Sequence, residues 1–177
     1  MHGCAADKLW LPPVNPSTNA SLFAFYEASA LLAAPADTSL LLWLEGGPGS
    51  SGLLSNFLQL GPYSLRRRPG DGASISHNPF AWNRRFGLLF LDNPLGTGFN
   101  AAPSTADIPR SQPAIAQHVL ASLESFFHAS PAHFRARPFF LAGDSYAGKY
   151  VPTVASCILA AKLLFRPLLA DRTTHSS

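Results

Sequence analysis

The sequence predicts an α/β fold with a mostly parallel sheet and flanking helices. Three short, almost wholly apolar runs lie at 40–44, 87–92 and 139–142, and glycine or proline follows each within two residues. A long segment with helical spacing separates the second run from the third. Strands that are apolar throughout are typical of parallel sheets with both faces covered, and their alternation with helices indicates this class.

The N-terminal half is predicted to add one early strand and one short helix to these elements. Residues 22–27 are expected to form the strand, and the Ala-rich residues 28–38 a connection or a short hairpin arm. Residues 53–60 predict a short helix that ends at Gly61-Pro62, a stop signal. Residues 64–80 are expected to be rich in turns, with the basic run at 66–68 in a solvated loop.

The strongest helical pattern in the chain begins after Ser111, whose hydroxyl can cap the first turn. Its apolar residues recur at helical spacing, and they are Ile115, Val119, Leu120, Leu123, Phe126 and Phe127. Pro131 ends this pattern, and Pro138 precedes the third apolar run. A further helix is predicted over 151–164.

The third apolar run leads into a serine between small residues, Gly143-Asp144-Ser145-Tyr146-Ala147-Gly148. A strand, a sharp turn and a helix would hold Ser145 above the sheet, as in a nucleophile elbow. The spacing departs from the strict G-x-S-x-G form, because Ala147 takes the fifth position and the glycine follows one residue later. An ordinary turn is the alternative for this stretch taken alone.

A glycine-rich loop, Glu45 to Gly52, follows the first apolar run. In hydrolases with an elbow, such a loop supplies one backbone N–H of the oxyanion hole, and the residue after the nucleophile supplies the other. A plain Gly/Pro loop is the alternative, whereas a dinucleotide loop fails because G-x-G-x-x-G is absent. The two motifs in this order favour the elbow.

Five ordered motifs between Leu9 and about Leu159 resemble the serine carboxypeptidase family, and the plant and algal serine carboxypeptidase-like group most closely. The motifs are Trp43-Leu44-Glu45-Gly46-Gly47-Pro48-Gly49, Gln59-Leu60-Gly61-Pro62, Asn78-Pro79-Phe80-Ala81-Trp82-Asn83, Leu89-Phe90-Leu91-Asp92-Asn93-Pro94-Leu95-Gly96-Thr97-Gly98-Phe99 and Gly143-Asp144-Ser145-Tyr146-Ala147-Gly148-Lys149-Tyr150-Val151-Pro152. The resemblance implies an α/β-hydrolase fold and a serine-type carboxypeptidase that acts on peptides without a cofactor.

The resemblance implies acyl transfer through a covalent ester on Ser145, with the oxyanion held by the N–H groups of Gly47 and Tyr146. It also implies that the substrate carboxylate is bound by an asparagine and two glutamates, whose positions here hold Glu45, Gln59 and Asp144. Two ionised acids would repel a carboxylate, and a shared proton could restore binding at acidic pH. An acyltransferase, as known among plant members, is an alternative activity.

The family's fold places the acid and the histidine of the triad after the serine. Asp171 and His175 have this order, but residues 166–177 resemble nothing in the family and too little chain remains to present them. Neither is expected to act. His77, His118, His128 and His133 precede the serine and are expected on the surface or as caps. No metal site is predicted, because neither the histidines nor Cys4 and Cys157 show a ligand spacing.

Composition excludes several other classes of function. The net charge is +3 with only 13% charged residues, which does not favour nucleic acid, and no apolar stretch approaches the length of a membrane span. Residues 1–8 lack the apolar core of a signal peptide, although the family is secreted or vacuolar. Asn19-Ala20-Ser21 is a glycosylation candidate. Two cysteines make no disulfide framework, and Ser50 stands where the family usually has cysteine.

Residues 1–165 are predicted to form one partial α/β-hydrolase domain, and residues 166–177 an atypical, disordered tail. A chain ending here would leave the strand at 139–141 with an unpaired apolar edge. Three interpretations stay open: a fragment of an active enzyme, a short inactive homologue that binds peptides or a partner, and a half-enzyme completed by a second polypeptide. A homodimer is not decided by the sequence.

Overall fold

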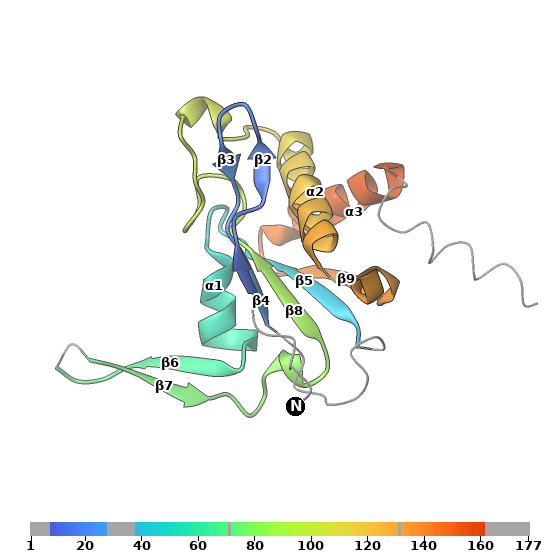
Figure 1. Ribbon diagram of the computed structural model, residues 1–177. Coiled ribbons are helices and arrows are strands. Elements are labelled where there is room, and N and C mark those ends of the chain that lie inside the picture. Colours follow the sequence, from blue (N-terminus) through green and yellow to red (C-terminus); the bar gives the residue numbers. More distant parts are fainter. Residues whose placement is uncertain (1–7, 28–37, 71, 131, 162–177) are drawn as a thin grey trace, which may run out of the picture.

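The computed structural model describes residues 8–27, 38–70, 72–130 and 132–161, and these form a five-stranded mixed sheet with helices packed on it (Figure 1). The strand order is β1-β4-β8-β5-β9. These strands span Lys8–Trp10 (β1), Ala24–Glu27 (β4), Gly87–Leu91 (β8), Leu40–Leu44 (β5) and Phe139–Gly143 (β9). β5 pairs in parallel with β8 and β9, whereas β4 pairs antiparallel with β1 and β8.

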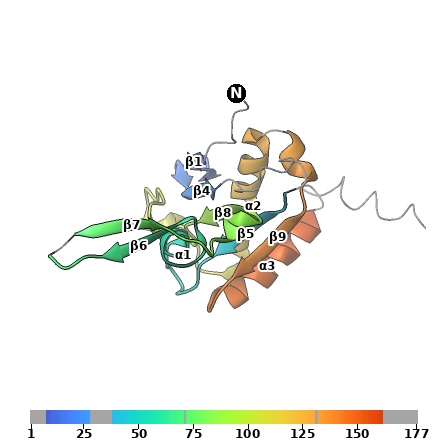
Figure 2. The same ribbon diagram turned by 90° about the horizontal axis from the view of Figure 1, so that it is seen from below.

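Two longer helices cover one face of the sheet, and a short helix lies on the other. α2 (Gln112–Ala129) and α3 (Ala147–Ala161) pack against Leu40, Leu42 and Leu44, and Figure 2 shows α3 running alongside β9. On the opposite face, α1 (Gly52–Ser55) continues into one π-helical turn, η1 (Asn56–Leu60). Leu60 from that turn packs on the alternate residues of β5 and β8. Short 3₁₀ turns complete the helices: η2 (Trp82–Arg84), η3 (Thr105–Asp107) and η4 (Ala132–Ala136).

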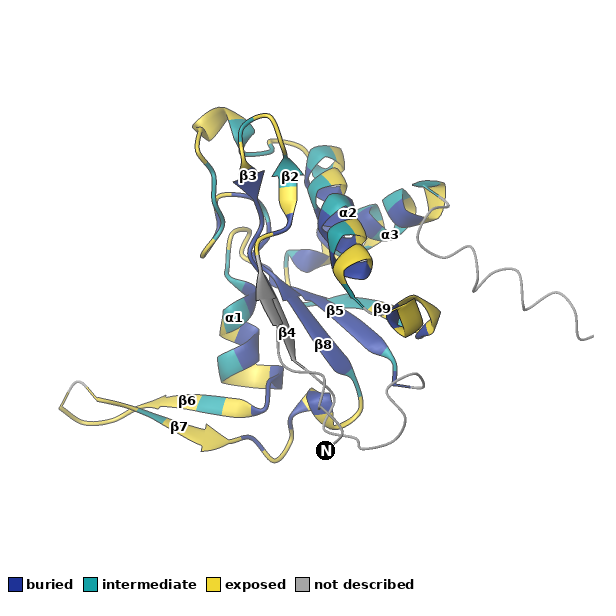
Figure 3. Cartoon of the chain, viewed as in Figure 1, coloured by how far each residue is buried: buried dark blue, intermediate teal, exposed yellow. Residues whose placement is uncertain are grey.

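The core is centred on β5 and β8, whose residues are all buried (Figure 3). Each strand is covered on both faces and paired on both edges, which explains why its sequence is apolar throughout. β9 differs, because among the described residues only β5 pairs with it, and Phe140 is 49% exposed. The sheet therefore has one well-buried centre and one partly open, apolar edge.

Two small antiparallel hairpins lie outside the main sheet. β2 (Pro13–Asn15) pairs with β3 (Ala20–Ser21), and β6 (Tyr63–Arg67) pairs with β7 (Ala73–His77). The β6–β7 hairpin projects away from the body of the molecule (Figures 1 and 2), and most of its residues are exposed (Figure 3).

The structure confirms the predicted strands at 22–27, 40–44, 87–92 and 139–142 and the Ser111-capped helix, within a few residues at their ends. Two predictions were wrong. The stretch at 64–80 is dominated by the β6–β7 hairpin, so two arginines of the basic run lie in a strand. The helix after the serine begins at Ala147 instead of 151, with Pro152 inside it. Predictions for 28–37 and 162–177 lie outside the described residues.

Candidate active site

Ser145 occupies the tight turn between β9 and α3, and its side chain is exposed. Its backbone φ is 53°, a left-handed conformation that non-glycine residues rarely adopt and that marks local strain. The turn closes with hydrogen bonds from Ala147 N to Asp144 O (2.9 Å) and from Gly148 N to Ser145 O (3.0 Å). The predicted strand, turn and helix are thus present, and the helix starts two residues after the serine.

Gly143 makes this sharp turn possible. A Cβ at this position would lie 2.3 Å from the carbonyl oxygen of Leu44 and 2.6 Å from the Cβ of Ala147. The end of β9 therefore touches both the end of β5 and the start of α3. Only a residue without a side chain fits between them.

The glycine-rich loop lies directly against the serine turn. Leu44 and Gly143 are partners in the parallel register, so the carboxyl ends of β5 and β9 meet at one edge of the sheet. A Cβ at Gly46 would lie 2.9 Å from both the Asp144 carbonyl oxygen and the Ser145 Cβ, and 3.0 Å from the Tyr146 nitrogen. Gly47 is exposed and has a φ of 113°. The structure brings both predicted motifs together.

Glu45, Gln59 and Asp144 belong to one hydrogen-bonded cluster beneath this loop. The Ser55 hydroxyl donates to Glu45 Oε2 and lies 3.3 Å from Gln59 Oε1. The backbone N–H of Gly46 is 3.2 Å from Glu45 Oε1 and 3.3 Å from Asp144 Oδ1. Glu45 is 7% exposed, whereas Asp144 is partly exposed. Ser55, which links two of the predicted residues, was not identified from the sequence.

Burial raises the pKa of Glu45 above its ordinary value, and the neighbouring carboxyl of Asp144 raises it further. The hydrogen bonds from Ser55 and from the Gly46 backbone act in the opposite direction, because they stabilise the charged form. Among the described residues, neither carboxyl forms an ion pair. The net effect is a raised pKa for Glu45, and Asp144 is the acidic neighbour that contributes to it.

Asp92, after β8, anchors the start of α1 and was also missed as a structural residue. Its Oδ1 accepts hydrogen bonds from Ser51 Oγ (2.5 Å) and Gly52 N (3.0 Å), and its Oδ2 accepts one from Phe99 N (2.8 Å). The side chain is buried. Its position after an apolar strand, at the edge where the other site residues lie, is the signal that could have identified it.

Among the described residues, no histidine is hydrogen-bonded to Ser145. None of His77, His118, His128 and His133 forms a hydrogen bond with the serine, and Asp171 and His175 lie outside the described ranges. His118 lies on α2, where burial lowers its pKa.

The remaining predicted features concern glycosylation, metals and membranes. Asn19 is exposed in the β2–β3 turn, with a φ of 59°. Within the part of the chain that the structure describes, no group of three or more His, Cys, Asp or Glu residues is arranged to hold a metal ion. No described helix is long and apolar enough to cross a bilayer.

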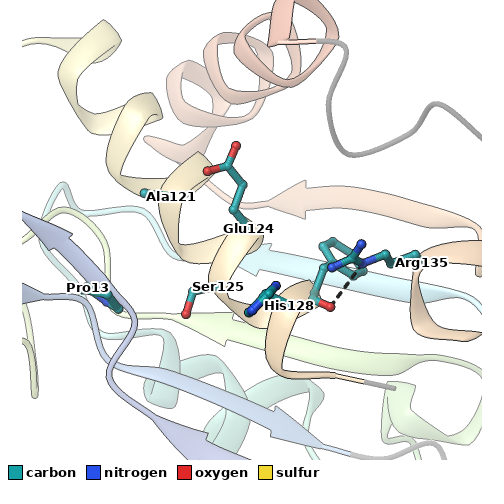
Figure 4. A pocket seen from close by; sticks show the side chains of 7 residues that line it. Pro13, Ala121, Glu124, Ser125, His128 and Arg135 are labelled. Atoms are coloured by element: carbon teal, nitrogen blue, oxygen red, sulfur yellow. Dashed lines mark hydrogen bonds between the residues drawn. The ribbon is translucent and has the colours of Figure 1, made fainter. Parts of the chain in front are cut away.

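A surface hollow on α2 lies apart from this cluster (Figure 4). Glu124, Ser125 and His128 line it together with Arg135, whose Nε donates to the Phe127 carbonyl (3.3 Å). None of the residues around Ser145 lines this hollow. We therefore assign the candidate site to the edge of the sheet where β5 and β9 end.

A mixed sheet whose strands β8, β5 and β9 are parallel, a strained serine turn and an adjoining glycine loop together define an α/β-hydrolase. A solved structure of the same fold is Kex1Δp, a prohormone-processing carboxypeptidase from Saccharomyces cerevisiae, with a TM-score of 0.75 and 26% identity over 88% of this chain and 34% of that chain. The family profile named serine carboxypeptidase matches residues 12–164. The chain belongs to the serine carboxypeptidase family.

Two relatives show how much of the family's length is present. Serine carboxypeptidase-like 50 of Arabidopsis thaliana is 48% identical over 85% of this chain and 33% of its own length. Serine carboxypeptidase S10 family member 1 of Dictyostelium discoideum is 35% identical over 85% of this chain and 34% of its own length. The chain spans about a third of the length of these relatives.

Proposed function

We propose that Ser145 is the nucleophile of a serine-type carboxypeptidase that releases C-terminal residues from peptides. The observation that carries this proposal is the left-handed φ of 53° at an exposed serine between a parallel strand and a helix. Such a turn lifts the hydroxyl above the sheet, where substrate and a base can reach it. Membership of a peptidase family supports a peptide substrate.

The proposed reaction is acyl transfer in two steps. The Ser145 hydroxyl loses its proton to a base and attacks the carbonyl carbon, and the amine leaves as the acyl ester forms. The N–H groups of Gly47 and Tyr146 would hold the oxyanion, and neither donates to an acceptor among the described residues. Water then attacks the ester and releases the acid. No cofactor takes part in this scheme.

We propose that the base is a histidine, oriented by an acid, from sequence equivalent to the remaining two-thirds of the relatives. That sequence would belong to the same polypeptide or to a second one. The lack of a described histidine at Ser145 supports this division. The lack of a described histidine at Ser145 also favours one alternative, a catalytically inactive homologue that binds peptides.

Acyl transfer to an acceptor other than water is a second alternative, and it would use the same serine. The family supports a secreted or vacuolar location. The Asn19-Ala20-Ser21 motif supports glycosylation at Asn19 if the chain enters the secretory pathway.

Fluorophosphonate labelling tests the nucleophile. We expect Ser145 to label rapidly once the chain is combined with a polypeptide equivalent to the part of Serine carboxypeptidase-like 50 that this chain does not cover, and the Ser145→Ala variant to stay unlabelled. Labelling of the chain by itself would show that the base lies within it. Equal labelling of the Ser145→Ala variant would rule out this serine, and no labelling of the folded complex would favour the inactive homologue.

A further inference from the structure

The β6–β7 hairpin carries exposed apolar and basic side chains that the proposed reaction does not use. It projects from the body of the molecule (Figures 1 and 2). Residues 63–77 contain three arginines, at 66–68, and a single acid, Asp71. Three large apolar side chains of the hairpin are between 42% and 65% exposed, namely Tyr63, Leu65 and Ile75.

The register of the two strands sorts these side chains onto two faces. Leu65 lies opposite Ile75, and Tyr63 lies opposite His77. Residues directly opposite share a face, and successive residues of a strand alternate between the faces. The apolar face therefore carries Tyr63, Leu65, Arg67, Ala73, Ile75 and His77. The polar face carries Ser64, Arg66, Arg68, Ser74 and Ser76.

The hydrogen bonds within the hairpin leave an outward set of backbone groups on β6. Arg68 N donates to Gly72 O (2.7 Å), and Asn78 N donates to Pro62 O (2.8 Å), so the even-numbered residues form the bonded pairs. Bonded and non-bonded pairs alternate in an antiparallel ladder. The N–H and C=O groups of Leu65 therefore point away from β7. Among the described residues, no third strand pairs with this edge.

The arginines of the polar face make this edge selective for negative charge. The side chains of Arg66 and Arg68 are exposed, and neither forms an ion pair with a described residue. Like charges on neighbouring strands repel, so the same arginines oppose pairing of this edge with that of a second copy. A strand that pairs here must bring acidic side chains.

The separation of the two faces favours an added strand over a lipid surface. A flat bilayer meets one face of a ribbon at a time, whereas Arg66 and Arg68 lie on the face opposite Leu65 and Ile75. The side chains of an added strand alternate, and so they reach both faces at once. Acidic residues would lie beside the two arginines, and apolar residues beside Tyr63 and Leu65.

We propose that the outer edge of β6 binds an extended peptide segment in which acidic and apolar residues alternate, by strand addition. Backbone hydrogen bonds to Leu65 hold the segment, and Arg66 and Arg68 select its acids. The partner is a peptide or protein segment with this pattern. The hairpin shares no residue with the candidate active site, so the inference is independent of the proposed role of Ser145.

The first test measures equilibrium binding of fluorescent peptides to the full chain by anisotropy. We expect the alternating probe acetyl-Glu-Val-Glu-Val-Glu-Val-amide to bind at least about tenfold more tightly than acetyl-Glu-Glu-Glu-Val-Val-Val-amide, which has the same composition, and than the alternating Lys-Val probe. Equal binding of the two acidic probes, or no binding of either, would overturn the proposal.

Variants locate the binding to the polar face. Combining Arg66→Gln with Arg68→Gln should weaken binding of the alternating acidic probe by about tenfold, because two charge pairs are lost. Combining Arg85→Gln with Arg110→Gln removes two other exposed arginines and should leave binding unchanged. Equal losses in the two double variants would show only general attraction to a basic chain and would refute the site.

A second test separates strand addition from charge attraction. Leu65→Pro removes the outward N–H of the edge and spares the bonded pairs of the hairpin, and Leu65→Ala controls for the lost side chain. We expect the proline variant to bind the acidic probe about fivefold more weakly than the alanine variant, the effect of one hydrogen bond. Equal affinities would exclude strand addition. Sedimentation of the chain with vesicles of phosphatidylserine and phosphatidylcholine, without binding of the probe, would assign the hairpin to lipid and overturn the proposal.

Discussion

At the scale of single residues, Gly46 joins the two halves of the candidate site. A side chain there would meet backbone and Cβ atoms of the serine turn at 2.9 to 3.0 Å, and none of these atoms can rotate away. We expect Gly46→Ala to destabilise the chain by about 1 to 3 kcal/mol, measured by urea unfolding, because such overpacking forces the backbone to shift.

Gly148→Ala is the matched control, since nothing lies within 4 Å of its added Cβ and the residue is helical. This variant should be neutral or up to about 1 kcal/mol more stable, as alanine favours the helix. Equal losses in both variants would show that the contact at Gly46 is not the cause.

Glu45 should make stability depend on pH. Its pKa is raised in the folded state above the ordinary value of 4.5, so the folded chain keeps this proton at a pH where the unfolded chain has lost it. The resulting stabilisation is present below 4.5 and is lost as pH rises through the raised value. Glu45→Gln should remove this downward slope, as seen in urea unfolding over a pH series. Glu124→Gln controls for the loss of one exposed negative charge, and an unchanged slope in Glu45→Gln would contradict the argument.

At the scale of elements, α3 buries a tyrosine hydroxyl that has no partner among the described residues. The Tyr150 ring is 1% exposed and packs against Tyr146, and burial raises the pKa of its hydroxyl. Because an unpaired buried hydroxyl costs free energy, Tyr150→Phe should stabilise the chain by about 1 kcal/mol in thermal or urea unfolding. A loss of stability would reveal a partner for this hydroxyl, and Tyr63→Phe, at an exposed position, is the control.

Some helices and strands could be predicted from the sequence, and others could not. β5, β8 and α2 were found because burial on both faces, or along one helical stripe, leaves a continuous or periodic apolar pattern. β6 and β7 were missed because most of their residues are exposed to water on both faces of the hairpin. Neither face is buried, so the sequence lacks the run of apolar residues that marks the buried strands. The start of α3 was placed too late because Pro152 suggested a boundary, yet the turn at Ser145 requires a helix at once.

At the scale of the molecule, the site could be predicted only where topology and resemblance agreed. Parallel pairing of β5 with β9 brings Glu45 and Asp144 together, since residues after neighbouring parallel strands share one edge. Ser55 could not be found this way. Its hydrogen bonds join Glu45 to Gln59 across the junction of α1 and the π-helical turn, and this junction leaves no sequence pattern.

The open edge of β9 should control association of the chain. Phe140 is half exposed on a strand that, within the described ranges, pairs on one side only. Phe140→Lys should reduce concentration-dependent light scattering, because lysine on an edge strand discourages pairing with another chain. Phe80→Lys is the control, since Phe80 is 83% exposed but lies outside the strands. An equal reduction in both variants would point to general hydrophobicity and not to the edge.

Backbone amides in the projecting β6–β7 hairpin should exchange with solvent at a different rate from those in the central strand β5. A two-stranded ribbon in water is only marginally stable, so the amides that pair β6 with β7 should exchange with deuterium through frequent local opening. The amides of β5 are enclosed by β8 and β9 and should exchange only when the whole sheet unfolds. Deuterium uptake followed by mass spectrometry should therefore resolve 63–77 from 40–44 at the earliest times, and similar uptake would mean that the ribbon is held by contacts elsewhere. Such a hairpin can accept insertions or a fluorescent label while the serine turn keeps its geometry.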